Sequence, residues 1–186
     1  MVELSQINAE ITHLKEELEK YQNETLLDPL TGLLNRRGCT EKLKHLSIND
    51  RHSSLFIDID HFKGVNDKFG QLIGDKVLQL IAKIIKKHIT GSDLAVRHGG
   101  EEFLVVMANK SINEAKDIAE KIRVAASNMK LVQRDTSICL PPISVSIGLA
   151  ENHGAKDWSS FFEEADGALG KAKAAGRNQC VCSEVA

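Results

Sequence analysis

The chain is 186 residues long, which is enough for one compact domain with a short appendage and too little for two ordinary domains. Hydrophobic residues make up 42% of it and charged residues 27%, which is typical of a globular protein. The formal net charge of -2 provides no long-range positive field, so we do not expect nucleic acid as a partner. An anionic substrate would therefore need metal ions or a few well-placed cations.

The cysteines and the start of the chain bear on its location. None of the cysteines forms a CxxC pair, so we expect reduced, packed thiols rather than a zinc site at Cys39, Cys139, Cys180 and Cys182. No apolar run approaches a membrane span, and the opening MVELSQINAE has no signal-peptide core. These features predict a cytoplasmic domain, while a segment upstream could still attach a longer protein to a membrane.

The first residues differ from the rest of the chain. Between residues 4 and 25, apolar residues recur at alternating steps of three and four with Glu and Lys between them, at Leu4, Ile7, Ile11, Leu14, Leu18 and Tyr21. This heptad pattern predicts a coiled-coil or linker helix over 1–27, so a separate compact domain is expected over 28–186. An amphipathic helix lying on its own domain is the alternative.

Helices and strands alternate beyond this boundary. Asp28-Pro29 resembles a cap with proline in the first turn, which predicts a helix over 29–47. The short apolar run SSLFIDID predicts a buried strand over 53–60. Apolar residues on one helical face predict a helix over 74–89.

The second half continues the alternation. Two strand-like runs joined by Gly-Gly predict a hairpin over 93–107, because a tight turn favours residues that adopt positive φ. A capping box of Ser111 and Glu114 begins a helix over 111–130. The remaining expected elements are a strand over 143–150, a helix over 157–175 that stops at Gly176, and a strand over 178–183. The fold class is α/β, with a central, mostly antiparallel sheet covered by helices.

Acidic residues occur in pairs at two places in the predicted fold. Asp58 and Asp60 end the buried strand and share one face of it, because side chains alternate along a strand. Glu101 and Glu102 follow the glycine turn of the hairpin. If strand and hairpin are neighbours, the acids converge and repel one another, which divalent cations such as Mg²⁺ would relieve. The alternative is that the glutamates solvate a turn and the aspartates cap a helix.

Five ordered segments give the chain a family resemblance. GGEEF (99–103) resembles the signature of the GGDEF family of diguanylate cyclases, and DPLTGLLNRRG (28–38), DIDHFKGVNDKFGQLIGDKVL (58–78), SVSIGLA (144–150) and ADGALGKAKAAGRN (165–178) resemble its other landmarks. The resemblance implies a palm-like α/β fold related to nucleotidyl cyclases and polymerases. It also implies that two GTP molecules are condensed into cyclic di-GMP and pyrophosphate.

The resemblance assigns metal and catalytic roles. Two Mg²⁺ (or Mn²⁺) ions per active site would be held by Asp58, the carbonyl of Ile59, and Glu101 or Glu102. We expect Glu101 to be the base for the ribose 3′-hydroxyl. Gly99 and Gly100 would leave room for the turn and the nucleotide, and Phe103 completes the motif.

Substrate contacts also follow from the resemblance. Asn66 and Asp75 match the guanine-reading pair, since a carboxylate accepts from N1 and N2 and an amide donates to O6. Backbone amides near His61, Phe62 and Lys63 would face the phosphates at the start of a helix. Lys173 and Arg177 match the phosphate-binding cations. The alternative is that Asn66 and Asp75 cap and solvate a helix start, and that Lys173 and Arg177 complement a helix dipole.

Three departures from the family pattern stand out. Gln71 replaces a histidine beside the guanine pocket, and Gly170 replaces a tyrosine within a helix. Thr90 replaces the arginine of the RxxD product-inhibition site, whose Asp93 is retained, so product inhibition through this site is expected to be weak or absent.

The resemblance also implies an assembly. Each domain would bind one GTP, so a homodimer is required, and an upstream sensor is expected in the full-length protein. Two rivals stay open: a degenerate domain that binds GTP or a partner without turnover, and a nucleotidyl cyclase for another base.

Overall fold

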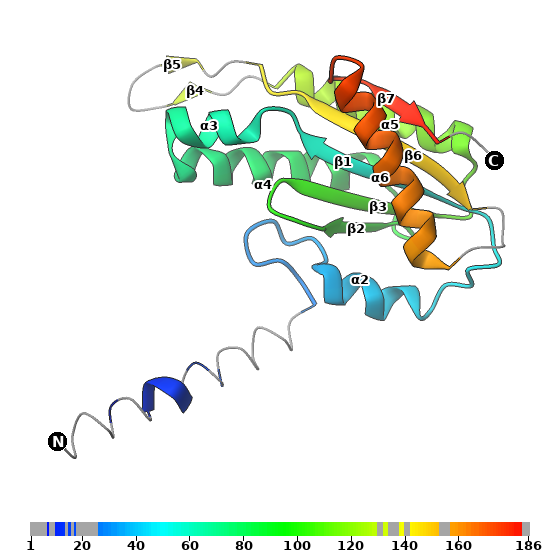
Figure 1. The fold of residues 1–186 in the computed structure, drawn as a ribbon, viewed down its shortest axis with the longest axis horizontal. Helices are drawn as coiled ribbons and strands as arrows, with labels where there is room; N and C mark the ends of the chain where they lie inside the picture. The colour runs from blue at the N-terminus through cyan, green and yellow to red at the C-terminus, as the bar shows by residue number, and fades with distance from the viewer. Residues whose placement is uncertain are drawn as a thin grey trace.

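A computed structural model of the chain describes residues 7, 10–13, 15, 17, 26–129, 132–133, 138–139, 142–152 and 157–183. A five-stranded sheet lies at its centre, with helices on both faces (Figure 1). The strands of this sheet are β1 (His52–Ile59), β2 (Leu94–Arg97), β3 (Glu102–Ala108), β6 (Val145–Asn152) and β7 (Cys180–Cys182). The helices are α2 (Arg36–Leu43), α3 (Phe62–Phe69), α4 (Gln71–His88), α5 (Ile112–Ser127) and α6 (Trp158–Ala174). A separate two-stranded sheet pairs β4 (Val132–Gln133) with β5 (Ile138–Cys139).

The strand order in the main sheet is β2-β3-β1-β6-β7. β1 is antiparallel to both β3 and β6, and β2 is antiparallel to β3, whereas β7 runs parallel to β6. The expected mostly antiparallel sheet covered by helices is thereby confirmed. The predicted buried strand is the central one, which explains why its residues are buried throughout.

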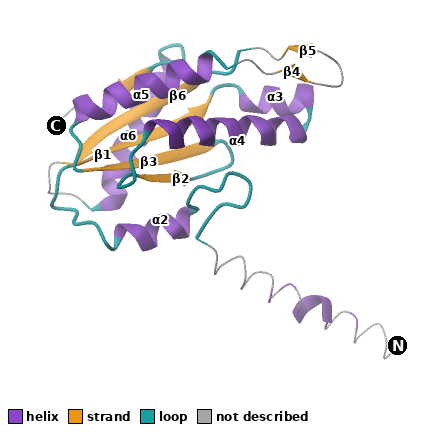
Figure 2. Cartoon of the chain, turned by 180° about the vertical axis from the view of Figure 1, so that it is seen from behind, coloured by secondary structure: helices purple, strands orange, loops and turns teal. Residues whose placement is uncertain are grey.

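The sheet separates two hydrophobic cores. From β1, Leu55, Ile57 and Ile59 enter the core under α3, α4 and α5, while Phe56 enters the core under α2 and α6. Figure 1 shows α6 in front of the sheet, and Figure 2, from behind, shows α4 and α5 in front. Because side chains alternate along a strand, the parity of β1 directs its even-numbered residues, Asp58 included, to the α6 side.

Gly148 of β6 sets how closely α6 packs on the sheet. A Cβ atom at this position would lie 2.0 Å from the carbonyl oxygen of Ala165 and 2.1 Å from the amide nitrogen of Leu169. The backbone of α6 therefore rests directly on the strand, which no side chain would permit.

The prediction of a helix over 29–47 is wrong at its start. Asp28 begins a turn, in which its carboxylate accepts hydrogen bonds from the amide and hydroxyl of Thr31. Gly32 then adopts a φ of +63°, which interrupts any helix. The helix α2 begins only after Asn35, whose side chain accepts from the amide of Gly38 at 2.8 Å.

The helix predicted over 74–89 begins earlier, at Gln71, and the short helix α3 precedes it. Gly70, with a φ of +82°, separates the two. The later elements agree with the expectations within a few residues, and the capping box of Ser111 and Glu114 is confirmed.

The heptad segment is described only in part. Residues 7, 10–13, 15 and 17 are helical, and Ile7 and Ile11 are 51% and 45% exposed, so neither is buried on the domain. Leu4, Leu14, Leu18 and Tyr21 lie outside the described residues, and the coiled coil stays a prediction. Within the described ranges, no helix is long and apolar enough to cross a membrane, and Cys39, Cys180 and Cys182 are free thiols.

Candidate active site

Two carboxylates meet where β1 and β3 lie side by side. Asp58, near the end of β1, stands opposite Glu102, the first residue of β3. Lys173 of α6 pairs with the first of them, since its Nζ lies 2.9 Å from Oδ2 of Asp58. Asp58 is only 6% exposed. The structure thus brings together the strand-end acid, the signature glutamate and one of the expected cations.

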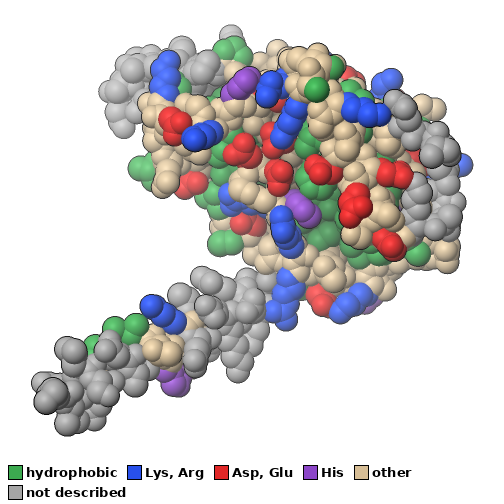
Figure 3. All heavy atoms as spheres, viewed as in Figure 1, with side chains coloured by type: hydrophobic (Ala, Val, Ile, Leu, Met, Phe, Trp, Pro, Cys, Tyr) green, Lys and Arg blue, Asp and Glu red, His purple; other side chains and the backbone are tan. Residues whose placement is uncertain are grey.

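The surroundings disfavour ionised carboxylates at this point. Burial raises the pKa of Asp58, and the nearby Glu102 and Asp60 add to this, although Lys173 acts in the opposite direction. Burial and Asp58 likewise raise the pKa of Glu101. A cation bound between these groups would relieve both the burial cost and the repulsion. On the face of the molecule that Figure 3 shows, acidic and basic side chains are interspersed, in keeping with the small net charge.

Asp60 does not belong to this cluster of potential ligands. Its Oδ1 accepts from the hydroxyl of Ser146 at 2.7 Å, and its Oδ2 accepts from the hydroxyl of Ser144 at 2.6 Å and the amide of Asn178 at 3.0 Å. These bonds tie the end of β1 to β6 and to the segment before β7. From the sequence we expected Asp60 to converge with the other acids. In the structure, both of its carboxylate oxygens instead accept hydrogen bonds that hold neighbouring segments together.

The signature turn is held by its own backbone. The amides of His98 and Gly99 donate to the carbonyl oxygen of Glu102 at 2.8 and 3.1 Å. A Cβ atom at Gly99 would lie 2.5 Å from Oε2 of Glu102, whereas one at Gly100 would meet open space. Neither glycine has a positive φ, so the expectation that the tight turn requires glycine for its backbone conformation was wrong. Gly99 is needed because the Glu102 side chain folds back over it.

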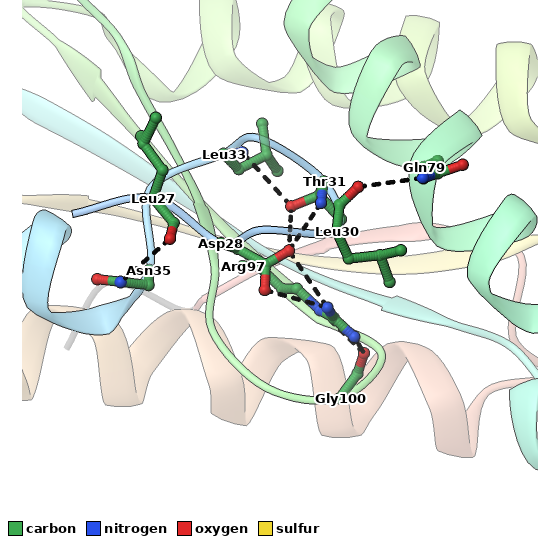
Figure 4. Close-up of polar contacts among 9 residues, drawn as sticks. All are labelled: Leu27, Asp28, Leu30, Thr31, Leu33, Asn35, Gln79, Arg97 and Gly100. Atoms are coloured by element: carbon green, nitrogen blue, oxygen red, sulfur yellow. Dashed lines mark hydrogen bonds and ion pairs between the residues drawn. The ribbon is translucent and has the colours of Figure 1, made fainter. Parts of the chain in front are cut away.

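Arg97, the last residue of β2, connects this turn to the start of the domain (Figure 4). Its Nη2 donates to the carbonyl oxygen of Gly100 at 2.8 Å, and its Nη1 donates to the two carboxylate oxygens of Asp28 at 3.2 and 3.1 Å. Although burial raises the pKa of Asp28, hydrogen bonds from Thr31 and the charge of Arg97 lower it overall. The sequence analysis missed this link, because Asp28 and Arg97 are 69 positions apart.

The expected guanine-reading residues lie on the other side of the sheet, where α3 meets α4. A Cβ atom at Gly74 would be 1.9 Å from Oδ1 of Asn66, so the absence of a side chain lets this amide lie against α4. Asp75 follows Gly74 in α4 and is exposed, as is Gln71 at the helix start. The structure therefore brings Asn66, Asp75 and Gln71 to one helix corner.

The first turn of α3 follows directly on the end of β1. Its N-cap, His61, has a φ of +57° and makes no side-chain capping bond. Phe62 is buried in the core and Lys63 is exposed. The amide end of this helix thus lies next in the chain to Asp58 and Asp60.

The two expected phosphate-binding cations are arranged differently. Lys173 lies in the last turn of α6 and is paired with Asp58. Arg177 lies beyond the helix end, exposed, with a φ of +65°. They are not two like charges on one helical face, as the spacing alone suggested. Gly170 is exposed, and a Cβ atom there would have no neighbour within 4 Å.

Asp93 has internal partners. It is 8% exposed, and its carboxylate accepts from the amide and hydroxyl of Thr90 at 2.8 Å and from Lys110 at 2.6 Å. Lys110 also donates to the Thr90 hydroxyl at 3.0 Å. The carboxylate is thus neutralised within the domain by a lysine that sequence reasoning did not identify.

The oxygen ligands at this site suit a hard divalent cation whose coordination would be completed by oxygen atoms of the substrate. Asp58, Glu102 and the carbonyl of Ile59 offer oxygen ligands, which Mg²⁺ prefers. Across the ranges described, no three His, Cys, Asp or Glu side chains are gathered into a ready-made metal cage. Mg²⁺ is commonly bound by one or two carboxylates together with substrate phosphates, so the residues present fit that mode.

Comparison with known proteins identifies the class. Residues 25–179 match the family described as diguanylate cyclase, GGDEF domain, and the chain belongs to this family. Diguanylate cyclase VdcA of Vibrio cholerae is 35% identical over 179 residues, which cover 94% of this chain and 53% of that protein. The response regulator PleD of Caulobacter vibrioides is 37% identical over 175 residues, covering 91% of this chain and 38% of PleD. The chain spans about half the length or less of these curated relatives.

Solved structures agree with the fold. The coiled coil and GGDEF domain of DgcB from Caulobacter crescentus, in complex with c-di-GMP, superimposes with a TM-score of 0.82 at 32% identity, covering 97% of both chains. The active GGEEF domain of a diguanylate cyclase from Vibrio cholerae gives a TM-score of 0.68 at 31% identity, covering 80% of this chain and 92% of that one. The five-stranded sheet flanked by helices is thus the palm-like cyclase fold, as the resemblance implied.

Proposed function

We propose that this domain is a diguanylate cyclase, which joins two GTP molecules into cyclic di-GMP and releases two pyrophosphates. The observation that carries the proposal is the pairing of Asp58 with Glu102 across the β1–β3 ladder, under Lys173. In each half-reaction the 3′-oxygen of one GTP attacks the α-phosphorus of the other. A bond forms to the phosphorus, the bond to pyrophosphate breaks, and the proton of the hydroxyl passes to a base.

Roles for the residues follow from their positions. Asp58, Glu102 and the carbonyl of Ile59 would hold Mg²⁺ (or Mn²⁺), two ions per site, which would activate the hydroxyl and offset charge on the phosphates. Glu101 lies on the turn next to Glu102, and its pKa is raised by burial and by Asp58, which makes it a stronger base than an ordinary glutamate. Glu102 faces Asp58 in the ladder, which favours it as a ligand and Glu101 as the base.

Substrate would lie around the end of β1. Asn66 and Asp75 at the α3–α4 corner offer an amide and a carboxylate that complement guanine, with Gln71 beside them. The amides at the start of α3, near Phe62 and Lys63, together with Lys173 and Arg177, would bind the phosphates. Adenine would leave Asn66 and Asp75 poorly paired, so GTP should outcompete ATP.

Each domain provides one half of the reaction, so two domains must face each other. The heptad residues 4–21 support a dimer, since a short tether raises the local concentration of the second half-site to roughly millimolar. Because the relatives are longer, we also propose that a sensor region precedes this domain in the full-length protein.

Product inhibition through the RxxD position is expected to be weak. Thr90 supplies no guanidinium for the product, and Asp93 is already paired with Lys110. Titration of the protein with cyclic di-GMP tests this point. Sub-micromolar binding that disappears in Asp93→Ala would contradict it.

Pyrophosphate release from GTP and Mg²⁺ at high protein concentration tests the activity. Glu102→Gln should reduce turnover by about a hundredfold or more, because a metal ligand is lost. Glu163→Gln, a matched change at an exposed position of α6, should leave turnover unchanged. Unchanged turnover in Glu102→Gln would refute the metal site, and GTP binding without pyrophosphate would indicate a binding module instead.

A further inference from the structure

A groove of about 650 Å³ lies between α2 and the beginning of α6, and none of the residues that line it is among the proposed metal or substrate ligands. Its walls include Leu43 of α2, Leu104 of β3, and Trp158 and Phe162 of α6. The volume is within the range of pockets that hold small organic molecules, which are usually lined by apolar and aromatic side chains.

The aromatic wall is built from rings in contact. The ring of Trp158 lies 6.0 Å from that of Phe162 and 5.3 Å from that of His52, measured between centroids. His52 is itself 1% exposed, and its Nε2 lies 2.8 Å from the carbonyl oxygen of Ser47. The wall is therefore fixed before any ligand arrives, which lowers the entropy cost of binding.

The charged side chains that line the groove among the described residues, Arg36 and Lys44, are both cationic. The described residues that line it include Arg36, Lys44 and His98 but no acid. The Nε of Arg36 donates to the carbonyl oxygen of His98, and its two terminal nitrogens have no partner among the residues described. Lys44 pairs with Glu41 at 2.8 Å, but their side chains are 61% and 44% exposed, so an anion can displace this weak surface pair.

We propose that this groove is a binding site for a small organic acid. The apolar body of the ligand lies against Trp158 and Phe162, and its carboxylate accepts hydrogen bonds from the guanidinium of Arg36. A neutral molecule of the same shape would gain the apolar contacts but not this charge-assisted bond. The site is separate from the Asp58–Glu102 pair and does not depend on GTP turnover.

Octanoate is a suitable probe, because it does not absorb where tryptophan emits, and Trp158 is the single tryptophan of the sequence. Titration of the full chain with octanoate should change the Trp158 emission saturably. Arg36→Gln should weaken octanoate binding about tenfold, the effect of losing one charge-assisted bond. Arg37→Gln, the same change at the neighbouring position of α2, should bind octanoate like the unmodified chain. Octanamide should bind about tenfold more weakly than octanoate.

A second pair of variants tests the charge preference of the groove without changing Arg36. Ser159 lines the groove from the exposed first turn of α6, where a glutamate is tolerated by the helix. Ser159→Glu should weaken octanoate binding by repulsion, while Ser159→Gln should not. The proposal is overturned if octanoate causes no saturable change, if octanamide binds as tightly as octanoate, or if Arg36→Gln and Arg37→Gln bind alike.

Discussion

Replacement of Arg97 by glutamine should separate the signature turn from the start of the domain. The guanidinium joins the carboxylate of Asp28 to the carbonyl oxygen of Gly100, and the side chains of Arg97 and Asp28 are only 17% and 16% exposed. Charge-assisted hydrogen bonds contribute about 1.5–3 kcal/mol each, and removal of Arg97 leaves the mostly buried carboxylate of Asp28 with its Thr31 hydrogen bonds but without a counter-ion. We therefore expect Arg97→Gln to lower the free energy of unfolding by about 2–3 kcal/mol.

A double-mutant cycle isolates the ion pair. Urea unfolding of Arg97→Gln, Asp28→Asn and the double variant should give a coupling free energy of about 1–2 kcal/mol. The control is Lys44→Gln, whose side chain is 61% exposed and whose partner Glu41 is 44% exposed, and which should cost at most about 1 kcal/mol. A coupling below about 0.5 kcal/mol between Asp28 and Arg97 would refute the argument.

The same variant should affect catalysis through the turn. Loss of the bond to Gly100 allows Glu101 and Glu102 to move, and displacements of about 1 Å can reduce turnover about a hundredfold. The KM for GTP should change much less, because Arg97 bonds to Asp28 and Gly100 and to none of the expected guanine-reading residues. A rise in KM with unchanged kcat would show that Arg97 acts on substrate binding instead.

Three further predictions concern stability. Gly148→Ala should destabilise the domain by about 2–4 kcal/mol in urea unfolding, because the new methyl group collides with the α6 backbone, and a cost below about 0.5 kcal/mol would contradict the close approach. Asp60→Ala should cost about 3 kcal/mol or more, since it leaves the partners of both carboxylate oxygens unpaired, whereas Asp60→Asn can keep most of these bonds and should cost about 1 kcal/mol. The lowered pKa of Asp28 means that its contribution to stability is present above its unfolded pKa of about 3.9 and is lost as pH falls through the lower folded value. The stability difference between the unmodified chain and Asp28→Asn should therefore be full at pH 7 and shrink below about pH 4, and a difference that does not change with pH would exclude this linkage.

The sequence was sufficient for the parts of the site that depend on local periodicity. The period of two along β1 placed Asp58 on one face and Ile57 and Ile59 on the other, and the structure has them so. The pairing of β1 with the hairpin was only a condition of the metal-site argument, and the structure meets this condition. The overall architecture could also be predicted, because long amphipathic helices and apolar strands have clear hydrophobic periods.

Other features of the site could not be predicted, because they depend on contacts between distant residues that the hydrophobic period of the sequence does not reveal. The helix α3 is short and bounded by Gly70, so its pattern gave no signal separate from α4. Asp60 could not be told from a metal ligand, because its role depends on Ser144 and Ser146 from another strand. The pairing of Asp93 with Lys110 likewise depends on how two loops meet.

The alternation of β1 between two cores also limits how the chain can change length during evolution. Insertion or deletion of one residue between His52 and Asp58 would exchange the side chains that face the two layers of helices. Asp58 would then point towards the apolar core under α4, away from Lys173. We therefore expect insertions and deletions to be tolerated before the strand, in the exposed segment 49–51. The length of this segment should vary among relatives of the domain, whereas the length of β1 should stay constant.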